Sequence, residues 1–159
     1  MTDTLSICLA QLNPVVGNVE ANIARARSAR AEAAAKGADL IVFTELFVSG
    51  YPPEDLVLKP AFQDAARAVL EDFAADTADG GPAVLIGVPL RDAGLLHNSV
   101  ALLEGGKVAE VRHKQMLPNY GVFDEMRVFA PGRDPDPIPF RGIKLGVPIC
   151  EDIWHEHVV

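Results

Sequence analysis

Long apolar runs that alternate with stretches of helical character constrain the fold of this chain more than any other feature. Three runs predict buried strands: residues 5–12 (LSICLAQL), 38–45 (ADLIVFTE) and 83–90 (AVLIGVPL). Such continuous apolar runs are typical of strands inside an α/β sheet, because helices cover both faces there. The chain is therefore expected to alternate strand and helix through its first half.

Two segments between these runs predict helices. Residues 19–36 are rich in Ala and Arg, with Asn18 as a candidate N-cap and Gly37 as a stop signal. Residues 60–77 carry apolar side chains at helical spacing, and Pro60 suits a first helical turn. We expect one face of this second helix to pack on the sheet.

The second half of the chain predicts two hairpins. Residues 97–114 turn at Gly105-Gly106, and residues 138–150 turn near Arg141-Gly142 and end at Cys150. The order β-α-β-α-β followed by hairpins indicates an α/β protein whose sheet mixes parallel and antiparallel strands. No interior linker or repeat divides the 159 residues, so we expect a single domain.

Composition excludes several classes of function. A net charge of −8 disfavours nucleic acid as a partner, and no apolar run approaches the ~18 residues of a membrane span. Residues 1–10 lack the pattern of a secretory signal. Two cysteines form no disulfide framework, and the four histidines show no metal-binding spacing. We expect a cytoplasmic protein with neither metal nor cofactor in this chain.

Three polar residues end strand-like runs and could meet in space: Glu45, Lys114 and Cys150. Ligand sites of open α/β sheets collect beyond the carboxyl ends of strands. An ammonium lowers the pKa of a nearby thiol, and a carboxylate can take its proton as general base. The lysine and the backbone N–H after the cysteine could then stabilise an oxyanion. Such a site would attack an amide or nitrile carbon.

Each of these residues also has a structural interpretation. Cysteines in apolar strands, Cys150 and Cys8 alike, usually belong to the core. A glutamate at a strand end, such as Glu45, is commonly a solvated cap, and a lysine after a hairpin, such as Lys114, a surface charge. Spacing alone favours these structural interpretations without excluding the functional one.

The surrounding motifs favour the functional interpretation. The stretches ADLIVFTELFVSGYPPEDL, RHKQMLPNYGVFDEMRVFAPG and LGVPICEDIW resemble the nitrilase (carbon–nitrogen hydrolase) superfamily. GYPPEDL and LPNYGVFDE resemble, more narrowly, the N-terminal glutaminase domains of glutamine-dependent NAD+ synthetases. The resemblance follows the chain in order over nearly its whole length.

The resemblance implies an α-β-β-α sandwich, of which residues 1–159 would form the N-terminal part. It implies glutamine hydrolysis with Cys150 as nucleophile, Glu45 as general base and Lys114 as oxyanion stabiliser. Tyr120 would lie against the glutamine, although it could equally be a loop aromatic that packs on its neighbours. Glu151 would contribute its backbone N–H.

Glu125 has two interpretations of equal weight. It is either a second carboxylate near the amide or the partner of Arg127 or Arg133 in a loop salt bridge.

The chain is shorter than the family domain, which should continue past Cys150. The family enzymes add a synthetase domain that uses ATP and Mg2+, and the released ammonia, to amidate nicotinic acid adenine dinucleotide. No phosphate-binding motif such as GxxxxGK[ST] occurs in these 159 residues, so ATP and Mg2+ are expected only in that missing domain. L-Glutamine and the missing domain are the expected partners, with a homo-oligomer and no membrane.

Two other functions stay open. The chain could belong to a stand-alone amidase or carbamoylase of the same superfamily. It could instead be an inactive folded fragment, whose exposed apolar sheet would favour self-association or docking on the remainder of the domain.

Overall fold

The computed structural model describes residues 4–133 and 136–158. Its main sheet has five strands in the order β1-β2-β3-β4-β5. These strands are β1 (Ile7–Ala10), β2 (Leu40–Phe43), β3 (Ala83–Asp92), β4 (Leu95–Glu104) and β5 (Lys107–His113). The pairs β1–β2 and β2–β3 are parallel, whereas β3–β4 and β4–β5 are antiparallel. The prediction of a mixed sheet is confirmed.

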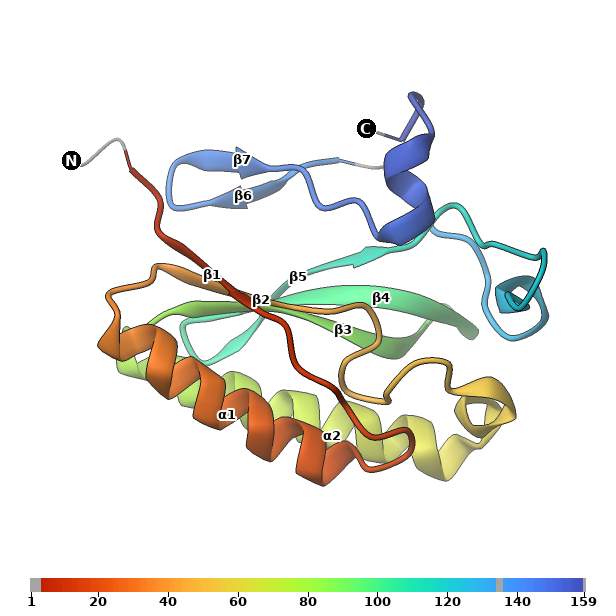
Figure 1. Cartoon of the computed structure of the whole chain (residues 1–159), viewed down its shortest axis with the longest axis horizontal. Coiled ribbons are helices and arrows are strands. Elements are labelled where there is room, and N and C mark those ends of the chain that lie inside the picture. The colour runs from red at the N-terminus through yellow and green to blue at the C-terminus, as the bar shows by residue number, and fades with distance from the viewer. Residues whose placement is uncertain (1–3, 134–135, 159) are drawn as a thin grey trace.

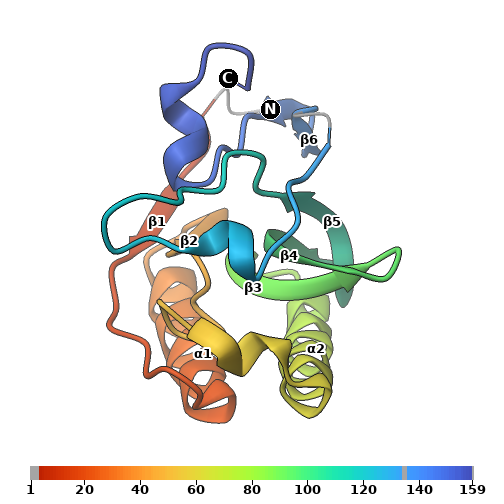
Figure 2. The same cartoon turned by 90° about the vertical axis from the view of Figure 1, so that its right-hand side faces the viewer.

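Two long helices cover one face of this sheet, as Figures 1 and 2 show: α1 (Val19–Ala35) and α2 (Pro60–Asp76). The side chain of Asn18 accepts a hydrogen bond from the Ala21 N–H at 3.2 Å, so the predicted N-cap is confirmed. Pro60 occupies the first turn of α2, where its missing N–H leaves no hydrogen bond unmade. The main core lies between these helices and the sheet, with Ile23, Leu70, Phe73, Ile41 and Ile86 among its buried members.

A short hairpin, β6 (Ile138–Phe140) with β7 (Ile143–Leu145), lies on the opposite face of the sheet (Figure 1). Its apolar side chains form a second core with the sheet, made by Ile138, Phe140, Leu85, Val100 and Leu102. The order helix layer, sheet, second sheet is that of an incomplete α-β-β-α sandwich. In the described part of the chain, no helix covers the outer side of β6–β7.

The described residues also form four short 3-10 helices: η1 (Glu54–Leu58), η2 (Thr77–Asp79), η3 (Glu125–Arg127) and η4 (Cys150–Trp154). Among the described residues, no helix is both long and apolar enough to cross a membrane.

Two details differ from the sequence prediction. Strand β3 runs on to Asp92 and returns through Ala93-Gly94 as β4, so the predicted third strand is also half of a hairpin. Strand β7 ends at Leu145, and Cys150 begins η4 instead of ending a strand. Pro148 lies between the two and lacks the N–H that a longer ladder would need.

Candidate active site

Glu45 lies in a tight turn directly after β2, where the chain passes over β3. Gly87 makes this passage possible, because a Cβ there would lie 2.2 Å from the Leu46 nitrogen and 2.6 Å from the Thr44 oxygen. The Val48 N–H also donates to the Gly87 oxygen at 3.0 Å. The turn therefore holds Glu45 at the carboxyl end of the parallel strands, as expected for a ligand site.

Lys114 follows β5 and points into the molecule. Its N–H donates to the Asn98 oxygen at 2.8 Å, and its own carbonyl accepts the Gly132 N–H at 2.7 Å. The side chain is fully buried, with Nζ 2.6 Å from Glu45 Oε1 and 3.0 Å from Glu125. Burial alone would lower the pKa of Lys114, but the charges of Glu45 and Glu125 outweigh it and raise that pKa. Lys114 is thus not a surface charge.

Glu125 is the second carboxylate on Lys114 rather than a partner of Arg127 or Arg133, so the salt-bridge alternative is wrong. Its side chain is nearly as buried as that of the lysine. The Tyr51 hydroxyl donates to Glu125 Oε1 at 3.0 Å, and burial together with that carboxylate raises the pKa of Tyr51. Arg127 forms its salt bridges elsewhere, with Glu54, Asp55 and Asp124.

Asn98 on β4 links the two carboxylates. Its Nδ2 donates to Glu45 Oε1 at 2.7 Å and to Glu125 Oε2 at 3.3 Å, and the residue is fully buried. These two bonds fix the amide orientation, because a reversed amide would place its oxygen against both carboxylates. Within the described residues, its Oδ1 is buried and has no hydrogen-bond partner. Sequence reasoning missed both Asn98 and Tyr51. Asn98 stands between two other buried polar residues of β4, His97 and Ser99, so the sequence does not single it out.

Cys150 is exposed, so it is not a core residue. It adopts φ 49°, a left-handed conformation that is uncommon outside glycine. It lines a pocket of about 140 Å³ together with Glu45, Gly87 and Ser99. Burial of the sulfur and the charge of Glu45 raise the pKa of Cys150, while Lys114 and the Glu151 N–H act in the opposite direction. A thiol whose pKa is raised depends on a base to become a nucleophile.

Glu151, whose side chain is mostly buried, follows the cysteine and contacts the exposed Tyr120. The Tyr120 hydroxyl donates to Glu151 Oε2 at 2.8 Å, which raises the pKa of Tyr120. The ring also packs edge-on against Phe123, with ring centroids 5.6 Å apart. Tyr120 thus makes the loop contact that its structural interpretation predicts, and it also stands next to the residue that follows Cys150.

The structure therefore brings Glu45, Lys114, Glu125 and Cys150 together from four separate segments. A thiol that serves as nucleophile, a carboxylate that serves as its base and an ammonium that stabilises an oxyanion can together cleave a carbon–nitrogen bond.

Comparison with known proteins decides the family. The family model for carbon-nitrogen hydrolases matches residues 6–159. The chain belongs to the carbon-nitrogen hydrolase family. This carbon-nitrogen hydrolase chain is similar to the glutamine-dependent NAD(+) synthetase of Rhodobacter capsulatus. The two sequences are 46% identical over 158 residues. That alignment covers 99% of this chain but 28% of the relative, so the chain spans less than a third of the relative's length.

Two solved structures share the fold of this carbon-nitrogen hydrolase chain. The glutamine-dependent NAD+ synthetase from Acinetobacter baumannii, in complex with ADP, aligns with a TM-score of 0.85 and 36% identity, over 97% of this chain and 29% of that one. A mutant of the amidase from Nesterenkonia sp. AN1, with acrylamide added at its active-site cysteine, aligns with a TM-score of 0.81 and 27% identity. It covers 98% of this chain and 61% of the amidase.

Proposed function

We propose that this chain is the N-terminal part of the glutaminase domain of a glutamine-dependent NAD+ synthetase. The observation that carries the proposal is the buried ammonium of Lys114, which lies between Glu45 and Glu125 while Glu45 and Cys150 line one pocket. The similarity of the chain to glutamine-dependent NAD(+) synthetases over nearly its whole length supports the choice of substrate.

The proposed reaction begins at the sulfur. Glu45 takes the thiol proton as Cys150 Sγ bonds to the amide carbon of L-glutamine, and the carbonyl electrons move to the oxygen. Lys114 and the Glu151 N–H stabilise that oxyanion. The protonated Glu45 then donates to the leaving nitrogen, so that ammonia departs and a thioester remains.

Water completes the cycle. Glu45 accepts a proton from water, whose oxygen attacks the thioester carbon, and the collapse of the second oxyanion releases glutamate and returns the proton to sulfur. In this proposal Glu125 keeps Lys114 charged and in place throughout, and Tyr120 contacts the bound glutamine from the surface side.

We also propose a use for the released ammonia. The ammonia would be used by a synthetase domain outside these residues, where ATP and Mg2+ would drive amidation of nicotinic acid adenine dinucleotide to NAD+. That makes the whole protein a ligase. We further propose a cytoplasmic location and a homo-oligomer, in keeping with the net charge of −8 and the exposed apolar side chains of β1, Ile7 and Leu9.

A second candidate is a stand-alone amidase, favoured by the likeness to the Nesterenkonia amidase. The two proposals differ in substrate and share the site. Ammonia release from L-glutamine, L-asparagine, acetamide and a carbamoyl amino acid would separate them. The first proposal expects glutamine to be preferred by orders of magnitude, whereas a preference for acetamide would select the second.

The role of Cys150 has its own test. Cys150→Ala should abolish ammonia release, whereas Cys8→Ala is the matched control and should not change it. In a protein that carries this chain together with a synthetase domain, Cys150→Ala should abolish NAD+ synthesis from glutamine and leave synthesis from free ammonia. Loss of both activities in a folded Cys150→Ala protein would refute the assigned role.

A further inference from the structure

We propose that Asp152 is a positioning residue that fixes the turn bearing Cys150 against the segment that follows Lys114. The proposal rests on the proposed role of Cys150 as nucleophile, and it concerns a residue that touches neither the thiol pocket nor the buried ion pair. Its evidence is a set of backbone hydrogen bonds to one buried carboxylate.

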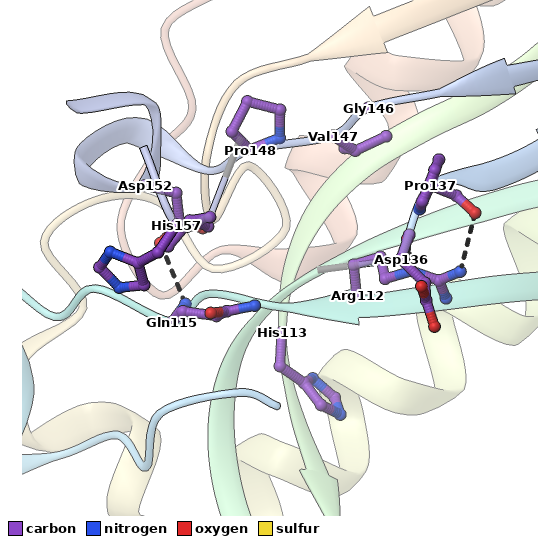
Figure 3. Close-up of a pocket in the computed structure, with 11 residues that line it drawn as sticks. Arg112, His113, Gln115, Asp136, Pro137, Gly146, Val147, Pro148, Asp152 and His157 are labelled. Atoms are coloured by element: carbon purple, nitrogen blue, oxygen red, sulfur yellow. Dashed lines mark hydrogen bonds between the residues drawn. The ribbon is translucent and has the colours of Figure 1, made fainter. Parts of the chain in front are cut away.

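The carboxylate of Asp152 accepts three backbone N–H groups. Oδ1 accepts from Gln115 at 3.0 Å and from Met116 at 2.8 Å, while Oδ2 accepts from Ile149 at 3.1 Å. The residue is 3% exposed, and no salt bridge to it is found in the described part of the chain. Figure 3 shows Asp152 and Gln115 joined by one of these bonds. All hydrogen bonds found to this carboxylate in the described residues come from backbone N–H groups.

These bonds join the two segments that carry the reacting groups. Gln115 directly follows Lys114, and Ile149 directly precedes Cys150. One carboxylate of Asp152 therefore binds Gln115 and Met116, which are 37 and 36 residues away in the sequence. The positive φ of Cys150 adds a reason for such a support, because a non-glycine residue stays in that region only where its surroundings hold it.

A purely local cap would be the simpler explanation, since Oδ2 closes the first turn of η4 onto the Ile149 N–H. A local cap leaves Oδ1 free, whereas here Oδ1 makes the two bonds to the distant segment. Two of the three hydrogen bonds therefore hold η4 to the segment that follows Lys114, and only one closes the turn of η4 itself.

The pockets separate this role from a catalytic one. Asp152 lines a cavity of about 320 Å³ together with residues of β5 and of the segments that precede β6 and follow β7 (Figure 3). Cys150 lines the other pocket, of about 140 Å³. The two share Val147 and Pro148 as a common wall. Asp152 thus faces a different cavity from the one that Cys150 lines. From there it can position the thiol without contacting a substrate bound beside Cys150.

Loss of this support has two effects of opposite sign. A turn that moves away from Glu45 loses the burial and the negative charge that raise the pKa of Cys150, so the pKa of the thiol falls toward its ordinary value of about 8.5. The same movement takes the thiol away from its proposed base. Reaction with a simple alkylating agent should become faster at neutral pH, while ammonia release from glutamine should become slower.

The test measures the pH dependence of iodoacetamide labelling, with Cys150 and Cys8 followed as separate peptides by mass spectrometry. Asp152→Ala removes all three acceptors. Asp152→Asn keeps the volume, but in either orientation its NH2 group faces at least one N–H group that the carboxylate accepts. We expect Asp152→Ala to lower the labelling midpoint of Cys150 by about 0.5–1 pH unit, which is roughly a three- to tenfold faster reaction at pH 7. Asp152→Asn should shift the midpoint in the same direction by less.

Thr77→Val is the matched control for lost stability. Thr77 is buried, and its hydroxyl donates to the Ala74 oxygen and accepts the Gly106 N–H at the far end of α2. All proteins are labelled below their own unfolding temperatures. Thr77→Val should lower the melting temperature and leave the midpoint of Cys150 unchanged.

Unchanged midpoints in both Asp152 variants, or an equal change at Cys8, would overturn the proposal. If Asp152→Ala does not fold, the isosteric Asp152→Asn decides. The labelling measurement does not depend on catalytic turnover. A chain that releases no ammonia would therefore count against the glutaminase proposal, while the labelling midpoints would still test the role of Asp152.

Discussion

Lys114→Met removes the cation between Glu45 and Glu125 and keeps an unbranched side chain of similar length. Nζ lies 2.6 Å from Glu45 and 3.0 Å from Glu125. At an effective dielectric constant of about 20, each contact corresponds to roughly 6 kcal/mol of Coulomb attraction, most of which desolvation offsets. Removal of one partner from a buried ion pair costs about 3–5 kcal/mol, because a buried charge is left without compensation.

We expect about 3 kcal/mol for Lys114→Met at pH 7, the lower end of that range. Glu45 keeps 18% of its side chain exposed and can turn toward water, which limits the loss. For a domain of this size, about 3 kcal/mol corresponds to a melting temperature lowered by roughly 6–12 °C. Thermal unfolding followed by circular dichroism measures this directly.

The pH dependence of the stability difference between wild type and Lys114→Met gives a second, independent test. The pKa of Lys114 is raised in the folded protein, so the stability it contributes is fully present below its unfolded pKa of about 10.4 and is lost as pH rises through the folded pKa. The difference between wild type and Lys114→Met should therefore stay constant from about pH 7 to 9.5 and shrink only at higher pH.

Glu125→Gln in the Lys114→Met background sharpens the test. Glutamine can still accept from Asn98 or Tyr51, but it no longer repels Glu45. The double variant should regain about 1 kcal/mol over Lys114→Met. An unfolding temperature of Lys114→Met equal to that of wild type, or a double variant less stable than Lys114→Met, would refute the reasoning.

Two further substitutions test the residues that hold Glu45 and Glu125 in place. Gly87→Ala should cost about 1–3 kcal/mol in thermal unfolding and lower Cys150-dependent ammonia release, because its Cβ would displace the backbone on either side of Glu45. Asn98→Asp should be less stable than Asn98→Ala at pH 7, with the gap closing near pH 5, because a third carboxylate would face Glu45 and Glu125; equal melting temperatures of the two Asn98 variants at pH 7 would contradict this.

Much of the fold follows from local patterns. The apolar runs gave the positions of β1, β2 and β3, and Gly105-Gly106 marked the β4–β5 turn correctly. The β3–β4 hairpin was not predicted, because Arg91 and Asp92 continue the ladder beyond the apolar run. Periodicity reports burial, and exposed ends of strands carry no such signal.

The site was only partly predictable. Motifs identified Glu45, Lys114 and Cys150, but spacing alone favoured a surface lysine and a core cysteine, the reverse of what the structure has. The burial of Lys114 depends on Glu125, which is 11 residues away, and on Glu45, which is 69 residues away. Asn98 and Asp152 act through such long-range contacts, so a single sequence offers no local pattern for either role.

The arrangement of charges explains why two carboxylates are useful on the proposed mechanism. In the resting site Lys114 has both Glu45 and Glu125 as partners. In the proposed mechanism, Glu45 becomes neutral when it takes the thiol proton, and an oxyanion for Lys114 to stabilise forms at the same moment. The site therefore exchanges one negative charge for another instead of creating a new one, while Glu125 holds the ammonium in place. A preorganised site of this kind needs little rearrangement as the charge moves, which is the condition under which electrostatic stabilisation of a transition state is largest.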